Sequence, residues 1–169
     1  YHNVDMIMQS INLFDEVTLE ETFDGEISVF NERNAGCPQN EDIAFKCADL
    51  FLKETKAPFS GIKINIKKNI PISAGLAGGS ADGAAVLVLL NRMYYEKVSL
   101  NELLKIGGKI GADIPFCILG GTARATGKGT EIKKIPAFDN YFLVLTKPSI
   151  SVCTKRAYSL FDSAQIKEF

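Results

Sequence analysis

The sequence predicts a mixed α+β fold, and three stretches carry that prediction. Residues 62–67 alternate isoleucine with polar side chains, which is the period-two pattern of a half-buried strand. Residues 81–90 are apolar nearly all round and too long for one strand, which indicates a buried helix. Residues 99–102 read Ser-Leu-Asn-Glu, a capping box that opens a further helix. The 169 residues, 46% of them hydrophobic, can form one packed core and are predicted to be one domain.

Ahead of the central strand, two shorter strands are predicted. Polar and apolar residues alternate over residues 15–22, where a first strand is expected after a bend. The dipeptide Asp24-Gly25 is a two-residue hairpin signal that leads into a second strand over residues 27–30. Residues 31–40 show no periodicity and are predicted to be a loop.

A helix is predicted to follow this loop. The Asp42 carboxylate can accept a hydrogen bond from a backbone N–H of the first turn, so the helix is expected to begin there. Pro58 prevents the helix from continuing, because proline has no N–H to donate. The apolar stripe of the helix consists of Ala44, Cys47, Ala48 and Phe51.

The stretch between the central strand and the buried helix is rich in glycine. Gly75, Gly78 and Gly79 lack Cβ atoms, so the backbone can turn tightly and bring its N–H groups close to a ligand. Ser80 or Asp82 can cap the helix that follows. Strand, loop and helix N-terminus together predict a site for an anion such as phosphate, and the alternative is a tight turn without a ligand.

Two helices are predicted downstream of the buried helix. The helix that Ser99 opens is expected to end at residues 107–108 or, after a further turn, at Gly111. Asp113 can then cap a short helix that carries Pro115 in its first turn, where proline is favoured.

The last part of the chain predicts three strands and a closing helix. The strands are expected over residues 122–126, 131–135 and 142–145, and the last of them is apolar enough to be buried. Thr154 can cap a helix that continues through Phe161.

Charge and cysteine content exclude several classes of partner. The 19 basic and 20 acidic residues leave a net charge of −1, which gives no general attraction to nucleic acid or to an anionic membrane. No apolar run is long enough to span a bilayer. The 4 cysteines are scattered without a C-x-x-C pair, which is typical of free thiols in a reducing cytoplasm and offers no metal site.

Three motifs resemble those of the GHMP small-molecule kinases. Residues 71–82, Pro-Ile-Ser-Ala-Gly-Leu-Ala-Gly-Gly-Ser-Ala-Asp, are similar to the phosphate loop of that family. Their double glycine resembles the branch that acts on 4-diphosphocytidyl-2-C-methyl-D-erythritol. Residues 1–15 resemble the segment that follows an Asp-Gly-Tyr-His motif in this branch, and residues 111–116, Gly-Ala-Asp-Ile-Pro-Phe, resemble its Gly-Ala-Asp-Val-Pro motif. The resemblance covers essentially the whole chain.

The resemblance implies a fold and an extent. The family has the fold of ribosomal protein S5 domain 2, with a left-handed βαβ crossover that periodicity alone does not predict. Residues 1–169 would be the N-terminal, ATP-binding domain of such a kinase, truncated at both ends and without the C-terminal domain. The catalytic lysine of the family's first strand would be absent, so the fragment is expected to be inactive. Its exposed apolar surface is expected to favour self-association.

The resemblance also assigns a nucleotide site. Backbone N–H groups of the loop would hold the triphosphate of ATP, and Mg²⁺ would be bound mainly through the phosphates. Lys68 matches a position near the adenine base, although a solvated lysine at a strand end is an equal alternative. Asp42 stands where relatives carry an Asn near that base. The expected nucleotide-binding residues are Lys68, Pro71, Ile72, Ser73, Ala74, Gly75, Leu76, Ala77, Gly78, Gly79, Ser80 and Ala81.

Five further residues are assigned to chemistry and substrate. Asp113 would orient or deprotonate the acceptor hydroxyl, whereas without the resemblance it is more simply an N-cap. Tyr1 and Tyr158 would stack on cytosine, His2 would hydrogen-bond its edge, and Thr154 would lie near the substrate diphosphate. Without the resemblance, Tyr158 is more simply a core aromatic residue.

The implied reaction is ATP-dependent phosphorylation of the 2-hydroxyl of 4-diphosphocytidyl-2-C-methyl-D-erythritol, in the non-mevalonate isoprenoid pathway. An alternative is another GHMP kinase that acts on homoserine, mevalonate or a sugar, although such substrates need no pair of stacking rings. A further alternative is a non-catalytic nucleotide-binding or RNA-binding module of the same fold. Near-zero net charge argues against RNA, which is usually bound by a basic face.

Overall fold

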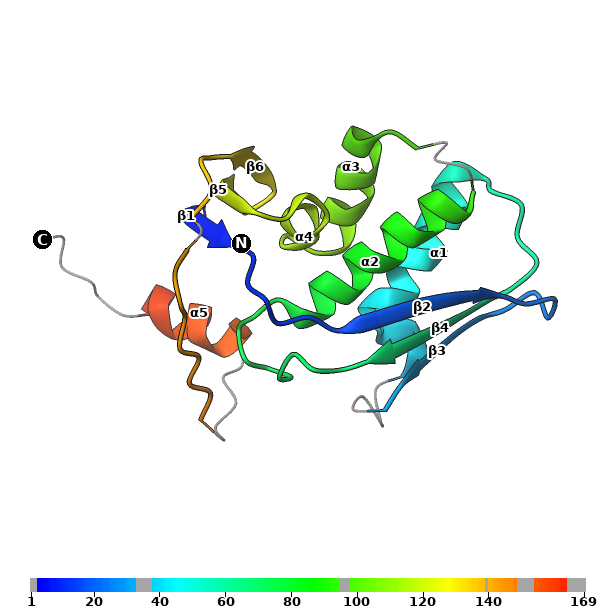
Figure 1. Cartoon of the computed structure of the whole chain (residues 1–169), viewed down its shortest axis with the longest axis horizontal. Coiled ribbons are helices and arrows are strands. Elements are labelled where there is room, and N and C mark those ends of the chain that lie inside the picture. The colour runs from blue at the N-terminus through cyan, green and yellow to red at the C-terminus, as the bar shows by residue number, and fades with distance from the viewer. Residues whose placement is uncertain (1–2, 33–37, 95–97, 139, 149–153, 164–169) are drawn as a thin grey trace, which may run out of the picture.

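The described part of the chain contains two three-stranded sheets, with helices packed beside one of them (Figure 1). The computed structural model describes residues 3–32, 38–94, 98–138, 140–148 and 154–163. The first sheet, in the order β2-β4-β3, consists of β2 (Glu16–Glu21), β4 (Ile62–Lys67) and β3 (Ile27–Asn31). The second sheet, in the order β1-β5-β6, consists of β1 (Val4–Gln9), β5 (Thr122–Gly127) and β6 (Glu131–Lys134). The α+β class predicted from the sequence is confirmed.

The hairpin predicted at Asp24-Gly25 is wrong, because β4 lies between the two strands that it would join. β2 pairs antiparallel with β4, and β3 pairs parallel with the other edge of β4. The turn itself forms, since the Asp24 carboxylate accepts hydrogen bonds from the Thr22 hydroxyl and the Glu26 backbone N–H. Gly25 has a φ of +75°, as such turns require. The local turn chemistry is as expected, and the long-range position of β4 decides the pairing.

Helix α1 (Ile43–Thr55) joins the parallel strands β3 and β4, after the short 3₁₀ turn η1 (Gln39–Glu41). Asp42 is its N-cap, and the carboxylate accepts a hydrogen bond from the Ala44 N–H at 2.7 Å. The helix ends at Thr55, three residues before Pro58, and the C-cap residue Lys56 adopts a left-handed backbone conformation. The predicted stripe is fully buried, namely Ala44, Cys47, Ala48 and Phe51. The unit β3-α1-β4 is thus a βαβ crossover, and its left hand stays a prediction.

The core lies between the first sheet and two long helices. Helix α2 (Gly78–Met93) packs against α1, and Figure 1 shows both helices on the same face of the sheet. The isoleucines of β4 alternate as predicted and point into this core. The fully buried large side chains of the two helices and β4 are Phe51, Ile62, Ile64, Val86, Leu87 and Leu90. Burial of apolar surface at this interface is the main stabilising term of the fold.

Two shorter helices follow and carry one of the sequence motifs. Helix α3 (Leu100–Ile110) opens with the predicted capping box at Ser99 and ends at Gly111. Helix α4 (Ile114–Leu119) comes next, with Asp113 at its N-cap position and a proline in its first turn. α4 packs against both α2 and α3. The packing of α4 on α2 brings the segment around Asp113 toward the beginning of α2.

The buried strand predicted over residues 142–145 is wrong. Phe142 and Val144 are almost fully exposed, and residues 142–145 belong to no described strand. The apolar composition of this stretch suits a buried strand, but no described element covers it. Beyond it, helix α5 (Thr154–Ser163) is close to the predicted helix, although Thr154, the predicted cap, is its first residue and the helix extends past Phe161. Figure 1 shows α5 at the opposite end of the molecule from the first sheet.

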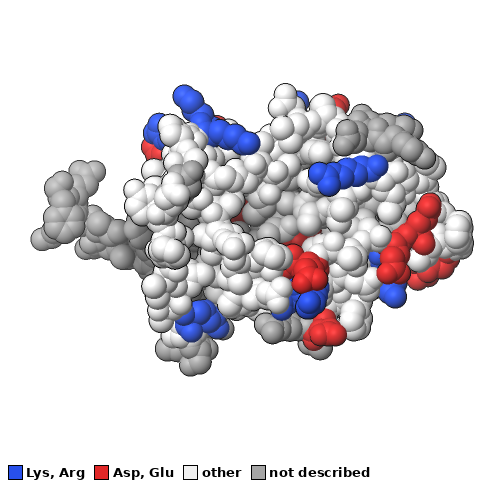
Figure 2. Space-filling view, viewed as in Figure 1, with Lys and Arg blue, Asp and Glu red and all other residues white. Residues whose placement is uncertain are grey.

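The surface of the chain mixes both signs of charge. On the face that Figure 2 shows, basic and acidic side chains are interspersed rather than gathered by sign. Arg124 and Asp5, for example, pair across β5 and β1, with Nε and Oδ1 at 2.7 Å. Among the described residues, no helix has the length and apolar character needed to cross a bilayer.

Candidate nucleotide site

The glycine loop between β4 and α2 borders a groove of about 510 Å³. Three of its residues adopt left-handed φ values, namely Ser73 at +55°, Gly75 at +71° and Ala77 at +52°. This path turns the chain sharply from the strand into the helix. The groove is lined by Asn31, Glu41, Asp42, Ile43, Lys68, Pro71, Ile72, Ser73, Ala74, Gly75, Leu76, Ala77, Gly78, Gly79, Ser80 and Asp82. The structure thus gathers nearly all of the predicted nucleotide-binding residues, Ala81 excepted, around one cavity.

The first turn of α2 carries no capping side chain. The N-cap residue is Ala77, whose methyl group cannot accept a hydrogen bond. Ser80 and Asp82, the two predicted caps, lie inside the helix instead, because it begins at Gly78. That prediction is wrong, since Ser80 lies three residues and Asp82 five residues after the observed N-cap Ala77. The uncapped N–H groups of the first turn, together with the positive end of the helix dipole, favour an anion in the groove.

Gly78 is required by close packing beneath the loop. A Cβ at this position would lie 2.9 Å from the Ile70 side chain and 3.4 Å from Lys68 Nζ. Any larger residue would therefore push the loop away from the end of β4. The glycine spacing that signalled a phosphate loop in the sequence thus has a steric cause in the structure.

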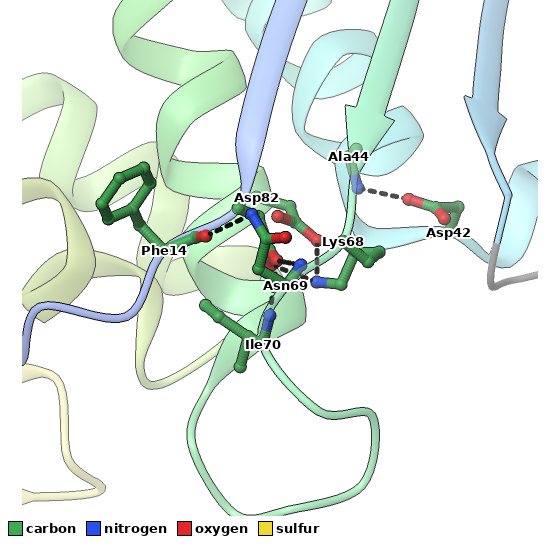
Figure 3. A network of polar contacts seen from close by, with 8 residues as sticks. Phe14, Asp42, Ala44, Lys68, Asn69, Ile70 and Asp82 are labelled. Atoms are coloured by element: carbon green, nitrogen blue, oxygen red, sulfur yellow. Dashed lines mark hydrogen bonds and ion pairs between the residues drawn. The ribbon is translucent and has the colours of Figure 1, made fainter.

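Lys68 lies at the centre of a buried network of charges (Figure 3). Its Nζ donates to Asp82 Oδ2 at 2.7 Å and also to Asp15 Oδ2. Lys68 is 9% exposed and Asp82 is 4% exposed. The solvated-lysine alternative is therefore wrong, while the position near adenine stays a prediction. Figure 3 shows the side chains of Lys68 and Asp82 pointing toward each other near the point where the glycine loop leaves β4.

The three groups of this network shift one another's pKa. Burial raises the pKa of Asp82 to about 6, against the opposing effect of Lys68. Burial also acts to raise the pKa of Asp15, but hydrogen bonds from Lys68, Ile70 and Asn69 outweigh it and leave that pKa lowered. The two carboxylates hold the pKa of Lys68 above its usual value in spite of burial. Two acids share one ammonium, so Asp82 is the group that takes up a proton first.

Asp113 occupies the N-cap position of α4 without capping the helix. Its side chain makes no capping hydrogen bond, and burial raises its pKa. The pKa of Cys117 is raised to about 11, first by burial and then by the negative charges of Asp113 and Asp82. Asp113 is not among the residues that line the groove. The neighbouring Gly111 lies close to α2, because a Cβ on it would be 3.9 Å from the hydroxyl of Ser80, which does line the groove. Asp113 is thus placed near the beginning of α2.

The residues predicted to bind the substrate are only partly described. Tyr1 and His2 lie outside the described residues, and Thr154 is described only as the first residue of α5. Tyr158 is 43% exposed, so the core-aromatic alternative is wrong. It lines a second, apolar groove of about 400 Å³ together with Asn3, Val4, Ala157 and Phe161. The segment that directly follows Tyr1 and His2 therefore lies beside Tyr158.

Sequence reasoning missed Asp15 and assigned Asp82 to a cap. Asp15 is the last residue of the stretch 1–15 that resembles the kinase family, but the resemblance assigns it no role. Its partners Asn69 and Ile70 are 54 and 55 residues away along the chain. Among the described residues, no group of three or more His, Cys, Asp or Glu side chains could hold a metal ion.

Comparison with known proteins gives this arrangement a family context. The family model described as "GHMP kinases N terminal domain" matches residues 42–121, which include the loop, α2, Asp113 and most of the core. The chain has the fold of a GHMP kinase N-terminal domain, and the resemblance inferred from the motifs is confirmed.

Particular relatives share more of the chain than the family model does. It is 43% identical to the 4-diphosphocytidyl-2-C-methyl-D-erythritol kinase of Clostridium perfringens (strain 13 / Type A) over 99% of its own length. It is 47% identical to the protein of that name from Clostridium tetani (strain Massachusetts / E88) over 98% of its length. The chain spans 58% and 59% of these two relatives.

A solved structure agrees with these matches. A crystal structure of 4-(cytidine 5'-diphospho)-2C-methyl-D-erythritol kinase superimposes with a TM-score of 0.68 at 32% identity. The superposition covers 80% of this chain and 47% of that protein.

Proposed function

We propose that the chain is the nucleotide-binding part of an ATP-dependent small-molecule kinase. Its substrate would be 4-diphosphocytidyl-2-C-methyl-D-erythritol, phosphorylated at the 2-hydroxyl in the non-mevalonate isoprenoid pathway. The observation that carries this proposal is the groove that the glycine loop and the uncapped start of α2 border. The names of the relatives at 43% and 47% identity favour this substrate over homoserine, mevalonate or a sugar.

The triphosphate would be held by backbone groups rather than by a charged side chain. Residues 71–81 offer N–H groups from the loop and from the first turn of α2, whose 16 residues align their dipoles toward the groove. Lys68 is engaged by two carboxylates, so it supports the site from beneath while remaining one of the groove-lining residues. This arrangement favours a phosphate chain by geometry and hydrogen bonding more than by net charge.

The described residues fit a nucleotide-borne metal better than a protein-held one. They contain no cluster of three potential metal ligands, so Mg²⁺ would be bound mainly by the phosphates of ATP. Bound ATP would supply the phosphoryl group, and Mg²⁺ would neutralise charge on it during transfer. The protein's own contribution is to hold the phosphate chain in one orientation in the groove.

Asp113 would orient the acceptor hydroxyl and accept its proton. Its carboxylate is half-buried and makes no capping hydrogen bond, and burial raises its pKa. A carboxylate whose pKa is raised toward the working pH is a better proton acceptor than a fully solvated one. Its place near the beginning of α2 would bring the hydroxyl close to the end of the phosphate chain.

The cytidine end of the substrate would lie near α5. Tyr158 lines the apolar groove together with Asn3 and Val4, which follow His2 in the sequence. Two aromatic rings would stack on the base, His2 would hydrogen-bond its edge, and Thr154 would contact the diphosphate.

The exposed apolar side chains suggest that the isolated chain associates with itself. Phe142, Val144 and Phe161 are exposed together with other large apolar residues of the same region. A sedimentation profile that stays monomeric at high protein concentration would contradict this part of the proposal.

The proposal is tested by calorimetric titration of the chain with AMP-PNP plus Mg²⁺ and, separately, with CDP. Each titration is repeated on Asp113→Asn, which removes the proposed base but none of the proposed binding groups. We expect both ligands to bind, and binding to survive the substitution because Asp113 acts in chemistry. A folded chain that binds neither ligand would overturn the proposal for these residues.

A further inference from the structure

Asp15 lies outside every motif of the phosphate site, yet its carboxylate contacts the beginning of the glycine loop. Oδ1 accepts hydrogen bonds from the backbone N–H groups of Asn69 at 2.6 Å and Ile70 at 2.8 Å. The side chain of Asn69 also donates to the Phe14 carbonyl at 3.0 Å, beside Asp15. Figure 3 shows Phe14, Asn69 and Ile70 close together at the point where the loop leaves β4. The first two residues of the loop are thus held by the segment that leads into β2.

The other oxygen of Asp15 reaches the far end of the loop through one lysine. Oδ2 accepts a hydrogen bond from Lys68 Nζ, which also donates to Asp82 Oδ2 in the second turn of α2. The side chains of Asp15, Lys68 and Asp82 are 2%, 5% and 6% exposed. A single buried carboxylate therefore connects both ends of the loop, since residues 71–77 lie between these two attachments.

The sign of the charge shows that this network does not attract phosphate. Two carboxylates surround one ammonium beneath a groove that favours anions, so the excess charge opposes a triphosphate. Asp82 Oδ1 is also buried without a hydrogen-bond partner among the described residues. Burial of these groups is costly unless they are well paired. The hydrogen bonds of the network fix the geometry of the loop.

We propose that Asp15 is a positioning residue for the phosphate loop, holding its first amides directly and the start of α2 through Lys68 and Asp82. The ligand named below rests on the proposed function, whereas the hold on the loop does not. A positioning role and a bystander role predict opposite signs for the same substitution. Without the carboxylate, a bystander would leave the groove less negative and triphosphate binding tighter.

The discriminating variant is Asp15→Asn, which keeps the shape of the side chain. An amide has one acceptor oxygen, whereas Asp15 accepts from three donors on two oxygens, so at least one attachment is lost. The matched control is Asp49→Asn, which removes a carboxylate from the exposed pair with Lys53 on α1.

The first measurement is amide hydrogen exchange of the chain without ligand. For Asp15→Asn we expect the amides of residues 69–70 to exchange about tenfold faster, as for a lost charge-assisted hydrogen bond. The exchange rates of the α3 amides in Asp15→Asn, and of all amides in the Asp49→Asn control, should match those of the parent chain. Unchanged exchange at 69–70, or equal acceleration everywhere, would overturn the proposal.

The second measurement is the affinity for AMP-PNP with Mg²⁺. We expect Asp15→Asn to weaken binding about tenfold, and unchanged or tighter binding would overturn the proposal. If the parent chain does not bind AMP-PNP, the proposed function fails, while hydrogen exchange still decides the role of Asp15.

If Asp15→Asn does not fold, Asp82→Asn serves as the test variant instead. The first hydrogen-bonded amides of α2, those of residues 81–84, should then exchange faster while those at 69–70 stay protected, and unchanged exchange at 81–84 would overturn the coupling.

Discussion

Two clusters of paired charges in this chain use the same residue types in opposite surroundings. Lys68 bridges Asp15 and Asp82 beneath the glycine loop, where all three side chains are at most 6% exposed. Arg124 pairs with Asp5 across β1 and β5, where both side chains are more than half exposed. The exposed pair has the better match of charges, one to one, whereas the buried network has one carboxylate in excess.

The difference teaches where a charge pair can matter for this fold. An exposed pair exchanges water contacts for contacts of similar strength, so it contributes little to stability. A buried pair contributes little net energy either, but removal of one partner leaves a charge without water or counter-ion. The buried network therefore holds the loop in one geometry rather than adding much stability, and changes to it should have large effects.

Removal of the shared lysine should have the largest effect. Lys68→Met keeps the length of the side chain but leaves two carboxylates buried together. We expect the free energy of unfolding to fall by roughly 3–5 kcal/mol at pH 8, measured by urea denaturation. A loss below about 1 kcal/mol, the usual value for an exposed pair, would contradict the buried network.

The pH dependence of stability should reveal Asp82. Its pKa in the folded chain is about 6, above the ordinary value of 3.8 for an aspartate, so the folded state binds more protons between these two pH values. The free energy of unfolding of the parent chain should therefore fall, relative to Asp82→Asn, as the pH rises from 4 to 6. The difference should reach roughly 2–3 kcal/mol and stay level above pH 7. A difference that is independent of pH would show that Asp82 titrates normally.

A smaller effect is expected in the loop that the network holds. Ala77 has a φ of +52°, where a Cβ is unfavourable and glycine is not. Ala77→Gly should raise the free energy of unfolding by about 1 kcal/mol, as measured by thermal denaturation with Ala74→Gly as control. Destabilisation by Ala77→Gly would mean that the left-handed geometry is not present in solution.

The smallest effect is expected at the exposed pair. Arg124→Met removes the partner of Asp5, whose pKa the guanidinium lowers. The urea midpoint should stay within error of the parent chain, because water solvates the remaining carboxylate. A loss as large as that of Lys68→Met would remove the contrast between the two clusters.

The sequence predicted those features that depend on neighbours in the chain. The Asp42 cap, the capping box at Ser99 and the alternating isoleucines of β4 each involve residues within a few positions of one another. Local propensity and periodicity suffice for such features. The glycine loop belongs to this group, since its tight turn and close packing follow from glycine spacing.

The features that the sequence missed depend on distant partners. The Asp24-Gly25 turn was identified, but β4 takes the pairing position between β2 and β3. The apolar run at residues 142–145 has the composition of a strand but lies beside no described strand. Lys68 reads as a solvated residue until the fold places Asp15, 53 positions earlier, against it. Such contacts are fixed by tertiary packing, which local pattern does not encode.

The central claim, that the glycine loop and the start of α2 bind the triphosphate of ATP, is tested most directly by nuclear magnetic resonance. The ¹⁵N-labelled chain is titrated with AMP-PNP and Mg²⁺, and the amide shifts are mapped onto the sequence. We expect the amide signals of residues 72–81 to shift together and those of α3 to stay unchanged. Shifts confined to other surfaces, with the signals of residues 72–81 unmoved, would contradict the claim.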